Sequence, residues 1–351
     1  MRVSGDRFWA FLGLFIAIVL VSFSAIFTKI SEQEIGANAT VFDRYSIALL
    51  VLILFQGVGT IGQHLKRAVT KEDDRENDRE QETFEHPGFE PVWEERYEMR
   101  DVYLFVGEGF LSLTCVWLWA ISLTQTSVAN SNLLHNLTPI FTTLGGIFWL
   151  RETIDRRFLG GLGCALLSTL LLQWQDWQLS PEYLWGDCLA LLSAVFYAAG
   201  FLAREQLRQK FSTSTVLFWN CACRTGFALF LVLGSTNSGF PLNLLPLSRS
   251  GWLAVLGLGI MIQIGGHGLL TYSLKHLSAS FATLCLLLDP VFTAIFAWGL
   301  LGEKLSLVHG ITFLGVLLGI YLAATASGAD PSRSPLDESE ILPSPDPPLQ
   351  T

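Results

Sequence analysis

The chain has 351 residues, of which 51% are hydrophobic and 15% charged, and its mean hydropathy is +0.44. A soluble protein of this length carries about a quarter charged residues, so this composition excludes an ordinary soluble domain. The net charge of −9 arises mostly from a loop and a tail, because 13 of the 31 acidic residues lie in the segment from Lys66 to Asp101 and 5 follow Gly328. It therefore gives no indication of a nucleic-acid partner.

Ten apolar segments have about the 20 residues that a helix needs to cross a bilayer. In chain order they are 8–27, 39–61, 102–123, 128–150, 158–173, 184–203, 215–234, 251–273, 279–300 and 307–324. Each is predicted to be helical, because lipid offers no hydrogen-bond partner to free backbone groups. The first segment is too long for a signal peptide and nine others follow it, so it is predicted to be the first helix.

The basic residues of the predicted loops lie mainly on one side of the membrane. With the N-terminus inside, the outer loops hold only Lys29, Arg249 and Lys304, while the inner ones hold most of the others, including Arg204 and Arg208. This asymmetry predicts that both termini are cytoplasmic. We therefore expect a multi-pass integral membrane protein, in the bacterial inner membrane.

The segments divide the chain into five parts. Residues 1–62 hold the first two helices, 63–101 a charged cytoplasmic linker and 102–177 helices three to five. Residues 184–325 hold helices six to ten. Residues 326–351, rich in Pro, Ser and Asp, are predicted to be a disordered cytoplasmic tail.

One unit of sequence occurs twice. Residues 137–142 (LTPIFT) recur 151 positions later as residues 288–293 (LDPVFT), and the proline of each copy is followed 13 residues later by a glutamate, Glu152 or Glu303. Each unit holds five predicted helices, and an odd number places the second unit upside down in the membrane. The fold prediction is thus an all-α integral membrane protein with ten transmembrane helices in two inverted five-helix repeats, an architecture of secondary transporters.

The sequence resembles the EamA-type permeases of the drug/metabolite transporter superfamily between about Phe8 and Ala324. Three groups of residues carry the resemblance: Ala120-Ile121-Ser122-Leu123 to Pro139 with Glu152, Gly186-Asp187 at the start of the sixth helix, and Tyr272-Ser273-Leu274 to Pro290 with Glu303. The resemblance implies two inverted bundles around a central cavity and transport of a small metabolite by alternating access, often with protons or by exchange. It implies no particular substrate, and the acidic linker departs from the compact family pattern.

Asp289 and Pro290 lie at the centre of the ninth segment. A charged side chain at mid-bilayer costs about 3 kcal/mol on insertion scales, so Asp289 must face a water-filled cavity or a partner, or be protonated. A functional proton site and a neutral aspartate that only packs two helices are equally compatible with the sequence. Pro290 removes a backbone donor, which leaves the Leu286 carbonyl free and kinks the helix.

The fourth segment has a polar face formed by Asn132, His135, Asn136 and Pro139. Their i, i+3, i+4, i+7 spacing places them on one side of a helix, and Pro139 frees the carbonyl of His135. As a group they are predicted to line the cavity. For each residue alone, an interhelical hydrogen bond worth about 1 kcal/mol or less is as good an interpretation.

Two arginines lie within predicted helices, Arg44 in the second and Arg224 in the seventh, one turn from Asn220. If they reach the cavity they attract an anionic or zwitterionic substrate. The alternative for Arg44 is an ion pair with its neighbour Asp43 at the outer interface.

Three further polar residues occur in predicted helices. Gln263 and His267, four residues apart in the eighth segment, are predicted to line the pore. Glu108, about two turns into the third, is predicted to line the inner vestibule or to pair with a basic residue.

Small residues recur four apart in the fifth and tenth segments, as Gly161 and Ala165 and as Gly315 and Gly319. This spacing is typical of close helix packing in membranes. The two helices are therefore predicted to pack together or against a second protomer, which makes a homodimer one option.

The motifs of pumps and enzymes are absent from the sequence: it has neither a phosphate-binding G-x-x-x-x-G-K-[ST] loop nor an H-E-x-x-H or G-x-S-x-G motif. No cofactor, bound metal or catalytic residue is predicted, and the expected partners are a small-molecule solute and the lipid bilayer. The leading prediction is a secondary transporter that moves a small organic metabolite by alternating access, with proton coupling or exchange. The alternative is a membrane sensor or scaffold that uses the same fold without transport.

Overall fold

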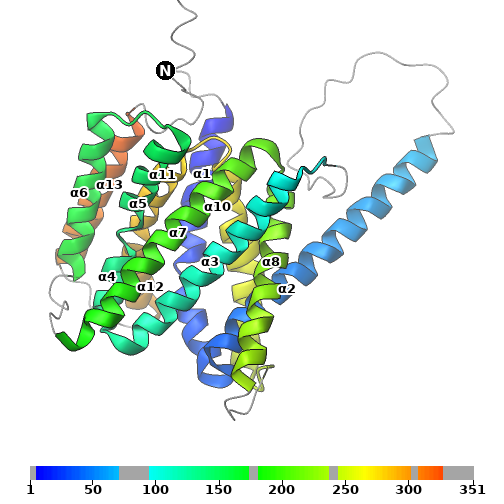
Figure 1. The fold of residues 1–351 in the computed structure, drawn as a ribbon, viewed down its shortest axis with the longest axis horizontal. Helices are drawn as coiled ribbons and strands as arrows, with labels where there is room; N and C mark the ends of the chain where they lie inside the picture. The colour runs from blue at the N-terminus through cyan, green and yellow to red at the C-terminus, as the bar shows by residue number, and fades with distance from the viewer. Residues whose placement is uncertain (1–4, 71–94, 174–180, 237–243, 302–306, 327–351) are drawn as a thin grey trace, which may run out of the picture.

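The computed structural model describes residues 5–70, 95–173, 181–236, 244–301 and 307–326, and the regular structure within them is helical (Figure 1). The first half contains α1 (Gly5–Val21), α2 (Ser24–Thr70), α3 (Met99–Gln125), α4 (Val128–His135), α5 (Thr138–Gly145), the wider π-helical turn η2 (Gly146–Leu150) and α6 (Arg156–Gln173). The second half contains η4 (Pro181–Tyr183), α7 (Leu184–Lys210), α8 (Thr213–Thr236), α9 (Arg249–Leu256), the π-helical η5 (Gly257–Gly266), α10 (His267–Ser273), α11 (Ala279–Cys285), the 3₁₀ turn η6 (Leu286–Leu288), α12 (Asp289–Leu301) and α13 (Leu307–Ala324).

All ten apolar segments fall on these helices. Within the described residues, seven helical stretches are long and apolar enough to cross a membrane: Ile26–Gly57, Met99–Ser122, Pro181–Lys210, Thr213–Gly234, Arg249–Ser273, Ala279–Phe296 and Leu307–Ala324. The protein is thus an all-α integral membrane protein, and the count of ten crossings stays a prediction. The domain boundaries also stay predictions, although α2 extends to Thr70, inside the predicted linker, and projects away from the bundle (Figure 1).

The bundle is apolar on its outside and polar in several places inside. Large apolar side chains such as Leu54, Phe148 and Phe230 are more than half exposed, as lipid-facing residues of a membrane protein are. Charged side chains such as Glu108 and Arg224 are buried instead. This distribution is the reverse of that in a soluble bundle.

The helices of the two halves pack in matched pairs. α2 lies against α8, and α6 lies against α13, so equivalent helices of the two units contact each other. The contact of α3 with α7 also has a counterpart, because the third helix of the second unit, which contains η5 and α10, packs on α1, the first helix of the first unit. The sequence duplication is therefore matched by an approximate two-fold arrangement of the helices.

Both proline-containing segments, for which the prolines predicted a kink, are divided into separate helices. The fourth segment consists of α4 and α5 with a turn at Asn136 and Leu137, and the ninth of α11, η6 and α12. Pro139 and Pro290 lie in the first turn after each break, where the missing N–H costs least. The first segment is also divided, since α1 ends at Val21 and α2 begins at Ser24.

Each broken helix starts with the same cap. Ser127 and Ser278 precede α4 and α11, and their side chains accept a hydrogen bond from the N–H of Asn130 and of Phe281. A serine N-cap satisfies one of the donors that the first helical turn leaves unpaired. The repeat is thus visible in local geometry as well as in sequence.

The carbonyls predicted to be free have partners, which corrects that prediction. Thr138 Oγ1 donates to the His135 carbonyl at 2.6 Å, and the N–H of Asp289 donates to the Leu286 carbonyl. The residue before each proline therefore replaces the missing donor. In the first copy this is a hydroxyl and in the second a backbone N–H.

The small residues of α6 and α13 pack against each other within one chain. A Cβ atom added to Gly161 would clash with the backbone of Gly319, and one added to Gly319 would clash with Gly161 and Ala165. The two helices can approach this closely only because both faces lack side chains. The predicted homodimer is not tested by this contact.

Candidate functional site

Glu108 of α3 lies at the centre of a buried charged network. Its Oε1 accepts hydrogen bonds from Arg204 Nη2 at 2.5 Å, Arg204 Nε at 3.1 Å, Arg224 Nη2 at 3.1 Å and Ser112 Oγ at 3.0 Å. Its Oε2 accepts from Asn220 Nδ2. We call Glu108, Ser112, Arg204, Asn220 and Arg224 the arginine cluster; each is at most 4% exposed.

The arginine cluster joins the two repeats. Glu108 and Ser112 come from α3 of the first repeat, and the two arginines come from α7 and α8 of the second. Arg224 lies in the middle of α8, well inside the bundle. The prediction that Glu108 pairs with a basic residue is therefore confirmed as geometry, and its place in a transport pathway stays a prediction.

The cluster continues through Tyr45 to Arg44. Arg224 Nη1 donates to the Tyr45 hydroxyl at 3.2 Å, and both arginine side chains lie over the Tyr45 ring, with Cζ 5.3 Å (Arg224) and 5.6 Å (Arg44) from its centroid. Such contacts are favourable for a cation. Arg44 donates to Gln263 Oε1 at 3.3 Å and to Ser24 Oγ at 3.4 Å, and among the described residues no ion pair joins it to Asp43, the partner in the alternative interpretation.

Several polar atoms around the cluster have no partner. Arg204 Nη1, Arg224 Nε and His267 Nδ1 are buried and make no hydrogen bond to any residue that the structure describes. The charges of both arginines and of Arg44 act on His267. Two arginine nitrogens and one histidine ring nitrogen in this buried region thus remain available to a ligand.

Gln263 and His267 lie where the eighth helix widens. Gln263 is at the C-terminal end of η5 and fully buried, and His267 is the first residue of α10. The glycines at the end of η5 permit its backbone to lie against α1, where Gly266 approaches Val21. Wider helical turns of this kind often occur at functional sites. Gln263 contacts Arg44, and the charges of Arg204 and Arg224 act on His267, while the role of both residues in lining a pore stays a prediction.

Asp289 lies in a different region. Its Oδ1 accepts a hydrogen bond from Ser22 Oγ at 2.6 Å, and Thr293 Oγ1 donates to the Ser22 carbonyl at 3.3 Å. Ser22 occupies the break between α1 and α2, so the kinked second-repeat helix meets a kinked first-repeat helix. Among the described residues, Asp289 has no cationic partner.

The polar face of the fourth segment is only partly preserved. His135 Nδ1 is 2.9 Å from Ser193 Oγ, and its ring lies 5.2 Å from that of Tyr197. Asn132 and Asn136 are half-buried, while Pro139 is buried. Because the helix is interrupted after His135, these residues do not form the continuous stripe that the spacing predicted.

A second carboxylate without a cation lies beside the paired breaks. Glu152 Oε2 accepts from Ser280 Oγ at 2.9 Å, and burial raises the pKa of Glu152 to about 6. Glu205 is close enough for the two carboxylates to interact, and it accepts the N–H of Ala279 at 3.0 Å. The twin glutamate, Glu303, lies outside the described residues.

Sequence reasoning missed Arg204, Tyr45 and Ser22. Arg204 and Arg208 were counted as loop cations, but α7 continues to Lys210 and both are nearly fully buried. A run of apolar residues ends at residue 203, yet the helix does not. Helical spacing was the available signal, since Arg204 and Arg208 are one turn apart and face the bundle together.

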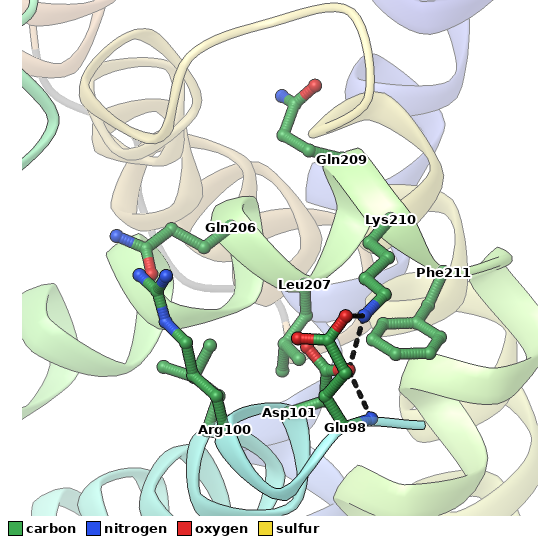
Figure 2. A pocket seen from close by; sticks show the side chains of 9 residues that line it. Glu98, Arg100, Asp101, Gln206, Leu207, Gln209, Lys210 and Phe211 are labelled. Carbon is green, nitrogen blue, oxygen red and sulfur yellow. Dashed lines mark hydrogen bonds and ion pairs between the residues drawn. The ribbon is translucent and has the colours of Figure 1, made fainter. Parts of the chain in front are cut away.

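A shallow groove of about 320 Å³ lies where α3 begins and α7 ends (Figure 2). Lys210 Nζ is 2.5 Å from Asp101 and 3.5 Å from Glu98 there, and Figure 2 shows it pointing at both carboxylates. Leu104 and Leu207 also line the groove, about one helical turn from Glu108 and Arg204. Glu108 and Arg204 themselves do not line the groove. The described residues include no group of three or more His, Cys, Asp or Glu arranged to hold a metal ion.

Known proteins with similar sequences are transporters. An uncharacterized transporter of Methanothermobacter thermautotrophicus is 24% identical over 326 residues, covering 90% of this chain and 86% of that protein. The pseudopaline exporter CntI of Pseudomonas aeruginosa is 27% identical over 63% of this chain and 73% of its own, and the riboflavin transporter ImpX of Fusobacterium nucleatum is 26% identical over 54% and 63%.

A solved crystal structure covers 90% of this chain and 97% of its own, with a TM-score of 0.67 at 19% identity, which shows a likeness of fold alone. The family description that matches this sequence is the EamA-like transporter family, and it matches twice, over residues 8–174 and 184–325. These two matches coincide with the two halves of the helical arrangement. The chain belongs to the EamA-like transporter family.

Proposed function

We propose that the protein is a secondary transporter that carries a small organic metabolite by alternating access, with its substrate site at the arginine cluster. The observation that carries the proposal is the position of this cluster: a buried ionic network that joins the first repeat to the second. In secondary transporters built from inverted repeats, substrate sites lie between the repeats near the bilayer midplane.

A purely structural role explains the cluster poorly. A buried ion pair is weak evidence for stability, because removing each ion from water costs several kcal/mol and apolar residues of similar size serve as well. Intramembrane ionisable residues are accordingly rare and usually functional. Glu108, Arg204 and Arg224 are three such residues in mutual contact.

The surrounding helices provide an entrance and movable parts. Leu104 and Leu207, which line the groove of Figure 2, respectively precede Glu108 and follow Arg204 by about one helical turn, and this makes the groove a candidate inner opening. The broken helices contact each other, since Thr142 Oγ1 of α5 lies 2.6 Å from Thr283 Oγ1 of α11. We assign the hinge motion of alternating access to these breaks.

The relatives support a small organic substrate. One relative is named a pseudopaline exporter and matches 63% of this chain, and another is named a riboflavin transporter and matches 54%. Proton coupling is the second part of the proposal. Asp289 is bonded to a hydroxyl and to no cation among the described residues, so its protonation breaks no ion pair, whereas protonation of Glu108 would break two.

Counterflow in liposomes tests the proposal. Purified protein is reconstituted into liposomes, and the liposomes are loaded with unlabelled metabolites from a panel of neutral, cationic and anionic compounds. Uptake of the matching labelled compound is then measured. We expect uptake of at least one compound above that of protein-free liposomes. If nothing moves, while deletion of the linker 63–101 disrupts a complex with another protein, the sensor or scaffold alternative replaces the carrier.

A further inference from the structure

We propose that the transported substrate carries a carboxylate, and that this carboxylate binds the arginine cluster by taking the place of Glu108. The inference rests on the proposed transport function and specifies the chemistry of its site. It also explains why one acidic side chain of the first repeat is bound to two basic side chains of the second.

The first argument is charge. Arginine stays protonated in proteins, so Arg204 and Arg224 bring two positive charges and Glu108 a single negative one. Arg44, on the same Tyr45 ring as Arg224, adds a third cation to the region. The buried region therefore has an excess of positive charge that a bound anion would neutralise.

The second argument is the number of donors. Glu108 Oε1 accepts from four groups, although a carboxylate oxygen offers about two lone-pair positions. Arg204 Nη1 and Arg224 Nε are buried and still have no partner among the described residues. Donors thus outnumber the acceptor positions of Glu108, so both arginines keep N–H groups that an incoming carboxylate can engage before it displaces Glu108.

The third argument is the group that the site already holds. Glu108 shows that a carboxylate fits these guanidinium and amide donors, with both oxygens engaged. Next to it, the ring of Phe201 lies 5.2 Å from Arg204 Cζ, and Tyr197 meets Phe201 edge to face at 4.9 Å. These rings suit the carbon skeleton of an organic acid better than a free phosphate.

The exchange links binding to motion. The Glu108 bonds to Arg204 and Arg224 tie α3 to α7 and α8, across the two repeats. A substrate carboxylate that binds the arginines releases Glu108 and so removes an inter-repeat contact. Substrate entry therefore favours the relative movement of the repeats that alternating access needs.

Chemical rescue tests the site without any knowledge of the substrate. In Glu108→Ala, the arginines lose their carboxylate and a small space opens. We expect formate and acetate to raise the thermal stability of Glu108→Ala in detergent much more than that of wild type, with formamide and acetamide inactive. Glu182→Ala, which removes an exposed carboxylate of η4 outside the groove, serves as the matched control and should respond as wild type does. Equal responses of all three proteins to formate would overturn the proposal.

A binding panel tests the substrate class. Purified wild type is screened for thermal stabilisation by lactate, succinate and citrate against lactamide, succinamide and glycerol, with inorganic phosphate as a separate arm. We expect carboxylates alone to stabilise, and Arg204→Gln to weaken their binding by about tenfold or more, the loss for one charge-assisted hydrogen bond. Arg157→Gln, the same change at an exposed arginine of α6, should bind as wild type does.

Three results contradict the inference: stabilisation by the neutral compounds, stabilisation by phosphate alone, or no effect of Arg204→Gln on the compounds that bind. If none of the compounds stabilises wild type and formate does not rescue Glu108→Ala, the inference is also wrong. These results leave the carrier function standing if counterflow of a neutral or cationic solute is observed. Failure of counterflow for the whole panel, with intact carboxylate binding, removes the transport function instead.

Discussion

Two regions of the bundle hold buried carboxylates in opposite surroundings. In the arginine cluster, Glu108 accepts hydrogen bonds from two guanidinium groups. At the paired breaks, formed by residues 128–150 and 279–301, Asp289 is bonded to Ser22, and Glu152, two residues after the first range, is bonded to Ser280, with no cation on either carboxylate among the described residues. The same kind of side chain is thus paired with cations in one region and with hydroxyl groups in the other.

This difference separates two tasks of a carrier. Cations hold a carboxylate in its charged form, whereas burial beside hydroxyls favours the neutral acid. The arginine cluster therefore suits binding of an anion, and the paired breaks suit uptake and release of protons. Because both regions join the first repeat to the second, either event can alter how the repeats contact each other.

The largest expected effect comes from removing the carboxylate of the cluster. Glu108→Leu leaves two buried arginines without a counter-ion and should cost about 3–5 kcal/mol of unfolding free energy. Asp289→Leu, the matched change in the paired breaks, loses one hydrogen bond and should cost about 1 kcal/mol. Denaturant unfolding in detergent measures both. Equal losses would show that the two surroundings do not differ as described.

The pH dependence of stability gives the next effect. Burial raises the pKa of Glu152 to about 6, above its unfolded value of 4.5, so the folded state binds more protons between these values. Glu152 therefore destabilises the fold increasingly as pH rises from 4.5 through 6, by a total of about 2 kcal/mol. Glu152→Gln should remove this part of the decline and be more stable than wild type at neutral pH.

The control for that measurement is Glu98→Gln, because the Glu98 side chain is 76% exposed. This variant should keep the wild-type decline. A Glu152→Gln variant that declines with pH as steeply as wild type would show that Glu152 is not buried beside Ser280 in the membrane-embedded protein.

The smallest effect on stability is expected for Asp289→Asn. An asparagine oxygen can still accept the Ser22 hydroxyl, so the unfolding free energy should change by less than about 1 kcal/mol. Transport, however, should lose its dependence on pH, while Ser22→Ala, which keeps the carboxyl group, should retain a pH-dependent flux. Uptake measured across acid and neutral pH compares the three proteins. If Asp289→Asn keeps the wild-type profile, the proton site lies elsewhere.

Local sequence patterns predicted the elements that have a local cause. The lengths of the apolar segments located the helices. Pro139 and Pro290 indicated where two of them are interrupted, because a residue without an N–H removes a hydrogen bond from the helix. The duplicated motif of residues 137–142 and 288–293 predicted the two repeats. The two breaks depend on residues within about two helical turns.

The site depends on contacts that no local pattern encodes. Arg204 and Glu108 are 96 residues apart, and they meet only because α3 crosses α7. Ser22 and Asp289 are 267 residues apart and meet where two breaks coincide. A hydropathy boundary also ended the sixth helix too early, which made a buried arginine resemble a loop cation.

The central claim is that the arginine cluster binds the transported solute. The most direct measurement is counterflow of a stabilising carboxylate in liposomes that contain wild type, Arg204→Gln or Arg157→Gln, at matched protein amounts and confirmed folding. The account predicts that Arg157→Gln, a change at an exposed arginine of α6, transports at the wild-type rate. Arg204→Gln should lose about nine tenths or more of its flux at low substrate, consistent with the loss of one charge-assisted hydrogen bond. Wild-type flux through Arg204→Gln would contradict it.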